Sequence, residues 1–277
     1  MIIQHNMFAM NMCRQLNDTS KKRGVSAEKL ASGYRISRSA NDAASLCISE
    51  KMRSQISGLY EASLNAQNGE SLIQSAEGAL IEIHSVLQRM RELTVQAAND
   101  TNVTSDRQVI ALEMHALTSE INRIATQTEF NTMKLLSGGF KGKGLQVGTN
   151  TSQVIYFSIS AMTAGKLGVS HGKIAKVVST AKACSTVTNL IKIVNSAIAK
   201  VSMQRSALGA LQNRLDHAIA NAECMRENLQ SAESKIRDID MADEMVKQSS
   251  LSILEQAGQS MLAQANQATQ GILNLLR

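Results

Sequence analysis

The fold is decided by residues 187–239, VTNLIKIVNSAIAKVSMQRSALGALQNRLDHAIANAECMRENLQSAESKIRDI. Apolar or small residues recur there at alternating steps of three and four, the a/d spacing of a coiled coil, and Gln204 is the one interruption. A helix of about 55 residues would extend about 80 Å, and its apolar stripe requires a partner helix. The stripe comprises Val187, Leu190, Val194, Ala197, Val201, Leu208, Leu211, Leu215, Ala218, Ala222, Met225, Leu229, Ala232, Ile236 and Ile239.

A second stripe in the first half of the chain supplies that partner. It ends at a cluster of turn-forming residues, 99–102, after which Thr104, Ser105 and Asp106 can cap another helix that runs to about Thr128. The two stripes together predict a mainly α-helical protein built on a long antiparallel coiled-coil rod. The second stripe comprises Leu59, Ala62, Ala66, Gly69, Ile73, Ala76, Leu80, Ile83, Leu87, Met90, Thr94 and Ala97.

The segment between the two stripes has a different character. Glycines accumulate over residues 137–148 and the helical period disappears. Residues 145–147 and 154–159 have the composition of short strands on either side of a turn at 148–151, which predicts a β-hairpin. Residues 161–183 combine small and basic side chains, and we expect a connecting loop there in which the chain reverses direction.

Composition supports helices and argues against other classes. Proline and tryptophan are absent and aromatic residues make up 3% of the chain, so the core must consist of aliphatic side chains. The net charge is +6, but the basic residues are dispersed, and the one tight run, residues 21–23, has no interleaved aromatics. We therefore expect no nucleic-acid partner.

Neither an enzyme nor a metal protein is predicted. The five histidines are scattered without a nucleophile or paired carboxylates nearby, and the sequence contains no phosphate-binding glycine loop or other cofactor motif. The cysteines lie far apart, without metal-ligand spacing. We expect reduced thiols, packed or half-buried among apolar neighbours, at Cys13, Cys47, Cys184 and Cys224, and the alternative is a disulfide between distant helices, whose contacts the sequence does not reveal.

The chain ends predict a protein that assembles. Residues 1–6 lack the features of a cleaved secretory signal, and no apolar run is long enough to span a bilayer, so no membrane insertion is expected. Both ends are helical in pattern, apolar on one face and rich in Ala, Ser, Gln and Asn. Because isolated amphipathic helices depend on packing for stability, we expect these ends to become ordered on association.

Several tracts resemble bacterial flagellins. Among them are LQRMRELTVQAAN at 87–99 and IRDIDMADE at 236–244. The matching tracts cover most of the chain except 161–183, and Ser45, Ser137 and the Asn131-Thr132 pair depart from the family pattern. The remaining tracts are 1–7, 29–36, 41–44, 48–56, 121–125, 128–131, 208–215 and 256–267.

The resemblance implies a short flagellin with little or no variable outer domain. The N-terminal and C-terminal helices would pair as an inner core domain, from residues 1–42 and 243–277. A rod domain would comprise N-terminal helices, hairpin and loop at 43–183 and a C-terminal helix at 184–242. The implied function is polymerisation into the extracellular flagellar filament for motility, after export in an unfolded state, without a cleaved signal peptide, through the flagellar type III apparatus.

Further partners follow from the same resemblance. They are other copies of the chain, filament cap and hook-junction proteins, an export chaperone and a host Toll-like receptor. The receptor would recognise Arg89, Leu93 and Glu113, which could equally serve subunit packing. The polymerisation and chaperone face would comprise Ile253, Leu254, Met261, Leu262, Ile272 and Leu273.

Two alternatives are other interaction proteins. A hook-filament junction protein shares flagellin-like ends, and a cytoplasmic signalling coiled coil shares the long heptads. The tracts at 87–99 and at the termini favour the filament subunit.

Overall fold

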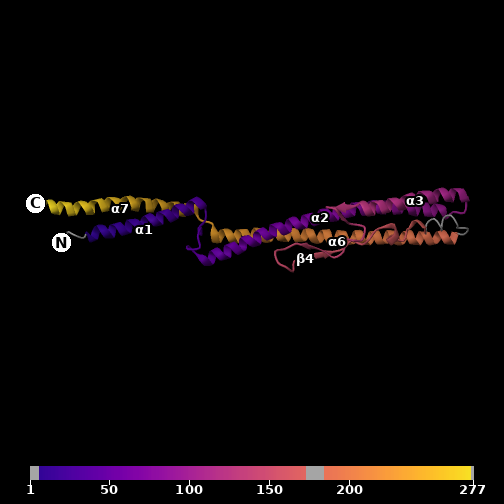
Figure 1. The fold of residues 1–277 in the computed structure, drawn as a ribbon, viewed down its shortest axis with the longest axis horizontal. Coiled ribbons are helices and arrows are strands. Elements are labelled where there is room, and N and C mark those ends of the chain that lie inside the picture. The colour runs from indigo at the N-terminus through magenta and orange to yellow at the C-terminus, as the bar shows by residue number, and fades with distance from the viewer. Residues whose placement is uncertain (1–5, 173–183, 276–277) are drawn as a thin grey trace. The chain divides into compact units, whose positions relative to one another are not determined.

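The computed structural model describes residues 6–172 and 184–275. The chain forms two compact units (Figure 1). Unit 1 contains Met1–Ile56 and Glu227–Arg277, and unit 2 contains Ser57–Arg226. The two stretches of unit 1 come from opposite ends of the sequence, so this unit can form only when the chain termini meet.

Unit 1 is built on two helices that lie side by side, α1 (Met7–Ser32) and α7 (Met241–Leu275) (Figure 1). The Asn6 side chain caps α1 by accepting a hydrogen bond from Ala9 N, and its amide donates to Ala265 O of α7 (3.1 Å). Gly33 ends α1 in the left-handed conformation, with φ of 73°. The predicted pairing of the terminal helices is confirmed.

The long helices α2 (Ala43–Ala97) and α6 (Cys184–Arg237) supply the core of unit 2 (Figure 1). Glu70 contacts Gln212, whereas Glu77, further along α2, contacts Arg205, earlier on α6. The two helices are therefore antiparallel, as predicted.

The predicted apolar stripes form the interior of unit 2. Every stripe position on α2 from Leu59 to Ala97 is buried, and on α6 the buried positions run from Val187 to Leu215 except Gln204. Beyond Leu215 the pattern weakens, and Met225 is exposed. The heptad period thus predicted the buried face correctly along most of its length.

Helix α3 (Thr104–Gln127) begins and ends within one residue of the predicted bounds. Its apolar residues Ile110, Met114 and Ile121 are buried in the same core as the two long helices. The side chain of Asp106 accepts a hydrogen bond from Val103 N, satisfying a donor at the start of the helix.

The predicted β-hairpin is present, with shifted ends. Strands β3 (Lys143–Gln146) and β4 (Val154–Phe157) pair antiparallel, with Gly144 opposite Tyr156. The hairpin lies close against α2, where two glycines leave room for it. A Cβ on Gly69 would lie 2.3 Å from Leu145 Cδ2, and one on Gly58 would lie 2.7 Å from Thr149 Cγ2.

The sequence did not predict a smaller hairpin, β1 (Glu129–Phe130) with β2 (Met133–Lys134). Its two turn residues, Asn131 and Thr132, both have positive φ, 46° and 64°. Positive φ at both positions is typical of the tight hairpin turn that favours Asn-Gly. Threonine in this turn is strained, because its branched Cβ opposes that conformation.

The expectation of a simple loop over residues 161–183 is wrong where the structure describes it. A short helix, α4 (Ala164–Leu167), follows Thr163, and it ends at Gly168 with φ of 90°. Leu167 and Val169 are buried and close the core beside α3. Residues 173–183 lie outside the described part of the chain.

Candidate functional site

The terminal helix pair has almost no apolar interior. Among the side chains of unit 1 that the structure describes, Ile36 and Ala265 are the only buried apolar ones. The other buried side chains are polar: Ser26, Ser49, Glu244 and Glu255. Hydrophobic burial, which dominates the stability of most domains, is therefore small in this unit on its own.

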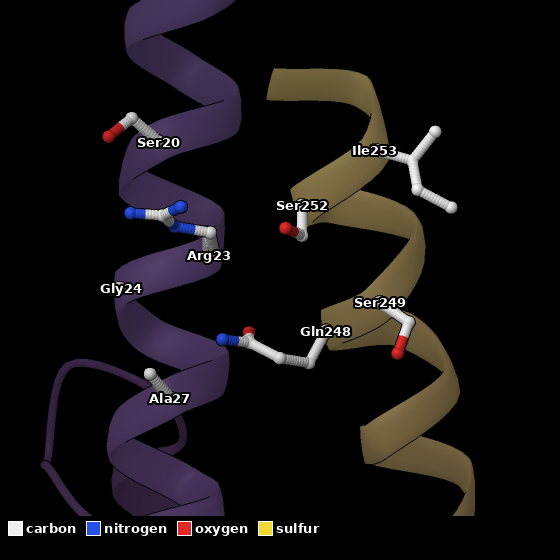
Figure 2. Close-up of a pocket in the computed structure, with 8 residues that line it drawn as sticks. All are labelled: Ser20, Arg23, Gly24, Ala27, Gln248, Ser249, Ser252 and Ile253. Atoms are coloured by element: carbon white, nitrogen blue, oxygen red, sulfur yellow. The ribbon is translucent and has the colours of Figure 1, made fainter. Parts of the chain in front are cut away.

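Polar contacts line the interface between α1 and α7. Arg23 Nη1 of α1 lies 2.7 Å from Glu255 Oε2 of α7. A hollow of about 720 Å³ between the two helices is lined mainly by small and polar residues, among them Ser20, Gly24 and Ser252. Figure 2 shows Gln248 extending from α7 toward α1, whereas Ile253 points away from α1.

The buried carboxyl of Glu244, at the start of α7, is held in its charged form. The hydroxyl of Ser26 on α1 lowers the pKa of the Glu244 carboxyl on α7 below its ordinary 4.5, and the ammonium groups of Lys247 and Lys29 act in the same direction against the opposing effect of burial. Glu244 is 7% exposed. Its charged form therefore stabilises the helix pair.

Large apolar side chains point outward from this unit. On α7, Ile253 is 66% and Leu254 58% exposed, Met261 is also exposed, and Leu262 is half-buried. Ile272 and Leu273 belong to α7, but their side chains lie outside the described part. The structure adds apolar residues that the sequence prediction missed, all exposed: Met7, Phe8 and Met10 on α1, and Met245 and Val246 on α7.

These missed residues had a signal in the sequence. Phe8 is one of four phenylalanines in the chain, and it lies in the first turn of α1, outside the two long apolar stripes. An apolar residue outside a seam is a candidate for an intermolecular contact. The sequence prediction followed the seams and therefore passed over the first turn of α1.

The structure brings two of the three predicted receptor residues together. Arg89 on α2 donates to Glu113 Oε1 on α3 through Nε (3.0 Å) and Nη2 (2.9 Å), and also to Glu92 Oε2 (3.1 Å). The hydrogen bond to Glu113 raises the pKa of Arg89 most, and the hydrogen bond to Glu92 raises it further. Both side chains remain about half exposed. Leu93 is buried, at 1% exposed, and belongs to the core beneath them.

The cysteines differ from the prediction. Cys13, Cys47 and Cys224 are exposed rather than packed among apolar neighbours. The predicted burial at these three positions is wrong because these faces of α1, α2 and α6 are open to solvent, and the side chain of Cys184 lies outside the described part of the chain. The described residues contain no cluster of three or more metal-ligating side chains. They also contain no helix long and apolar enough to cross a membrane.

Unit 2 has a helical core with antiparallel long helices, and the terminal helix pair of unit 1 exposes large apolar side chains, an arrangement typical of a helical structural subunit. Family models for the bacterial flagellin N-terminal helical region, over residues 3–141, and C-terminal helical region, over residues 191–276, match this chain. The chain belongs to the bacterial flagellin family, and it is a subunit of the extracellular flagellar filament rather than an enzyme.

Curated relatives match over their whole length. The chain is 47% identical to a flagellin of Halalkalibacterium halodurans and 46% identical to a flagellin of Bacillus subtilis, and each alignment covers 100% of both chains. A flagellar hook-associated protein from Vibrio parahaemolyticus has a similar fold, with a TM-score of 0.61 and 14% identity over 72% of this chain and 100% of the other. The fold alone is thus shared with hook-associated proteins, and sequence identity favours the filament flagellins.

Proposed function

We propose that the exposed apolar residues of the terminal helices are the surface through which copies of this flagellin pack in the filament. This assembly face comprises Ile253, Leu254, Met261, Leu262, Ile272 and Leu273. The observation that carries the proposal is the contrast within unit 1, where polar residues occupy the interface and large apolar residues face outward. Burying one such side chain on association contributes about 1.5–3 kcal/mol.

The assembly face is tested by replacing its two most exposed described residues, Ile253 and Leu254, with asparagine. The matched control is Gln256→Asn, which places the same side chain at an exposed position of α7 without removing apolar area. We expect the double variant to stop elongating from filament seeds while Gln256→Asn elongates normally. Normal elongation by the double variant would refute the assignment.

We propose that an export chaperone covers the same face before the subunit leaves the cell. An apolar helix face with exposed residues at helical spacing suits a helix-binding groove. The proposed route is unfolded export through the flagellar type III apparatus, without a cleaved signal peptide, and it rests on family membership. Binding of the isolated chaperone to the Ile253→Asn/Leu254→Asn variant should weaken at least tenfold, and unchanged binding would contradict a shared face.

We propose the expected division into an inner core domain, 1–42 with 243–277, and a rod domain, 43–242, as the assembly units. The contact of Arg35 N with Arg237 O (2.7 Å) is compatible with a junction near these limits. Cap and hook-junction proteins, as further partners, would engage the same terminal helices. Limited proteolysis of the monomer tests the division, because cleavage should remove the terminal segments before any cut within 57–226.

We propose that the surface around Arg89 and Glu113 is recognised by the flagellin-sensing Toll-like receptor. The ion pair fixes the guanidinium across α2 and α3, so this charged surface needs little ordering on binding. Leu93 supports it from within the core.

Receptor activation by soluble monomer is the test. Arg89→Ala should lower potency at least tenfold, while Arg123→Ala should change it little. Arg123 is a suitable control because it is also a half-exposed arginine paired with a carboxylate, that of Glu120. Equal potency of wild type and Arg89→Ala would refute the receptor surface, and failure of Arg89→Ala to form filaments would show a role in packing.

A further inference from the structure

Charge is distributed very unevenly along the chain. Residues 130–215 contain eleven Lys and Arg residues and no Asp or Glu. The remaining residues carry more acidic than basic side chains. Within this 86-residue stretch no carboxylate is available to the cations, although two of them have partners outside it, Lys134 with Glu129 and Arg205 with Glu77.

A hollow of about 560 Å³ in unit 2 concentrates this charge. Lys141, Lys166 and Lys200 line it, and all three are exposed. No carboxylate is among the lining residues. Lys200 Nζ lies 3.3 Å from the backbone oxygen of Lys166, which holds the two lysines at neighbouring positions of the rim.

The rest of the hollow is a formed recess rather than a patch of mobile side chains. Its floor includes the buried residues Met162 and Leu167. Ser160 N donates to Gln204 Oε1 (3.4 Å), which joins the segment after β4 to α6 across the hollow. Ser137 adds a hydroxyl. Ammonium groups surrounding a walled recess focus a positive potential in it.

We propose that this recess binds the carboxylate or sulfate groups of an extracellular acidic polysaccharide. The lysines match the anionic groups, and the hydroxyls and the Gln204 amide match sugar hydroxyls. Its volume suits a ligand of one or two sugar residues. In a filament, neighbouring subunits would each bind one anionic group of the same polymer, so that many weak sites together give a high overall affinity. This multivalent binding rests on the proposed filament assembly.

The lining favours a polysaccharide over nucleic acid. No aromatic residue lines the hollow, so bases have no stacking surface. No arginine lines it either, so bases also lack a guanidinium plane on which to stack. Lysine supplies point charges, which hold carboxylate and sulfate groups without a fixed geometry.

The test measures binding of purified full-length monomer to polygalacturonate and dextran sulfate, with neutral dextran as the blank and duplex DNA as the competing class. The variants are Lys166→Gln and Lys200→Gln. The matched control is Lys192→Gln, because Lys192 is an exposed lysine of the same helix as Lys200 and does not line the hollow. Circular dichroism verifies that each variant is folded.

We expect binding to at least one acidic polysaccharide and none to dextran. Lys166→Gln and Lys200→Gln should each weaken it about tenfold, as loss of a charged contact does, and Lys192→Gln less than twofold. An equal loss in all three variants, equally tight binding to DNA, or no binding to either polymer would overturn the proposal. Because monomers are measured, this outcome is independent of whether the assembly face is correctly assigned.

Discussion

Gly69 provides a sharp test of how the β3–β4 hairpin packs on α2. A Cβ at this position would lie 2.3 Å from Leu145 Cδ2 and 3.3 Å from Leu145 Cδ1. Carbon atoms in contact normally lie about 3.5–4.0 Å apart. Gly69→Val would therefore force the Leu145 side chain out of its place against the helix and loosen the packing of the hairpin there. Gly78 of the same helix is the control, because a Cβ there meets nothing within 4 Å.

The expected magnitude follows from two opposing effects. Overpacking typically costs about 1–3 kcal/mol, whereas replacing glycine within a helix regains roughly 0.3–0.5 kcal/mol through helix propensity. Gly69→Val should therefore destabilise the monomer by about 1–2.5 kcal/mol. Gly78→Val should be neutral or slightly stabilising, because only the propensity term applies.

The assay is urea unfolding followed by circular dichroism, combined with hydrogen exchange of the amides in β3 and β4. Gly69→Val should lower the unfolding free energy relative to Gly78→Val and accelerate exchange in the hairpin. Equal unfolding free energies, together with unchanged exchange, would refute close packing of the hairpin on Gly69.

Three further predictions concern single residues. Thr132→Gly should stabilise unit 2 by about 0.5–1 kcal/mol, since glycine relieves strain at φ of 64° but costs chain entropy, and an unchanged melting temperature would contradict it. Folding lowers the pKa of Glu244, so its charged carboxyl stabilises the helix pair above pH 4.5, and this stabilisation is lost as the pH falls through the pKa of the folded state. Protection of α7 from proteolysis should decrease over the same pH range, and in Glu244→Gln the protection should not depend on pH there. Leu211→Asp should destabilise the core by about 3 kcal/mol or more because it buries an unpaired charge, and unchanged thermal unfolding would count against the seam.

The sequence predicted the elements that a period or a turn pattern defines. Alternating steps of three and four predicted the buried faces of α2 and α6, and the turn residues at 99–102 predicted the start of α3. The strands of the larger hairpin were predicted by composition. In each case the physical cause is local, so a short window of sequence contains it.

The sequence did not predict features that depend on contacts between residues far apart in the chain. The sequence predicted Gly69 as a position of the apolar stripe. It did not predict that Leu145, 76 residues later, packs against this glycine. Leu93 lies one helical turn from Arg89, and only the packing of α3 over α2 shows that the leucine is buried and the arginine exposed. The exposed Met7 and Phe8 lie in no seam, and only the position of α7 shows which face of α1 remains open.

Seeded filament growth of a chain ending at Gln259 measures whether the end of α7 is needed for subunits to pack into a filament. The truncation removes Met261, Leu262, Ile272 and Leu273 from the assembly face and leaves unit 2 intact. We expect the truncated subunit to unfold at the same temperature in unit 2 but to add no length to seeds, while the full chain elongates them. Filaments of normal length from the truncated subunit would contradict it.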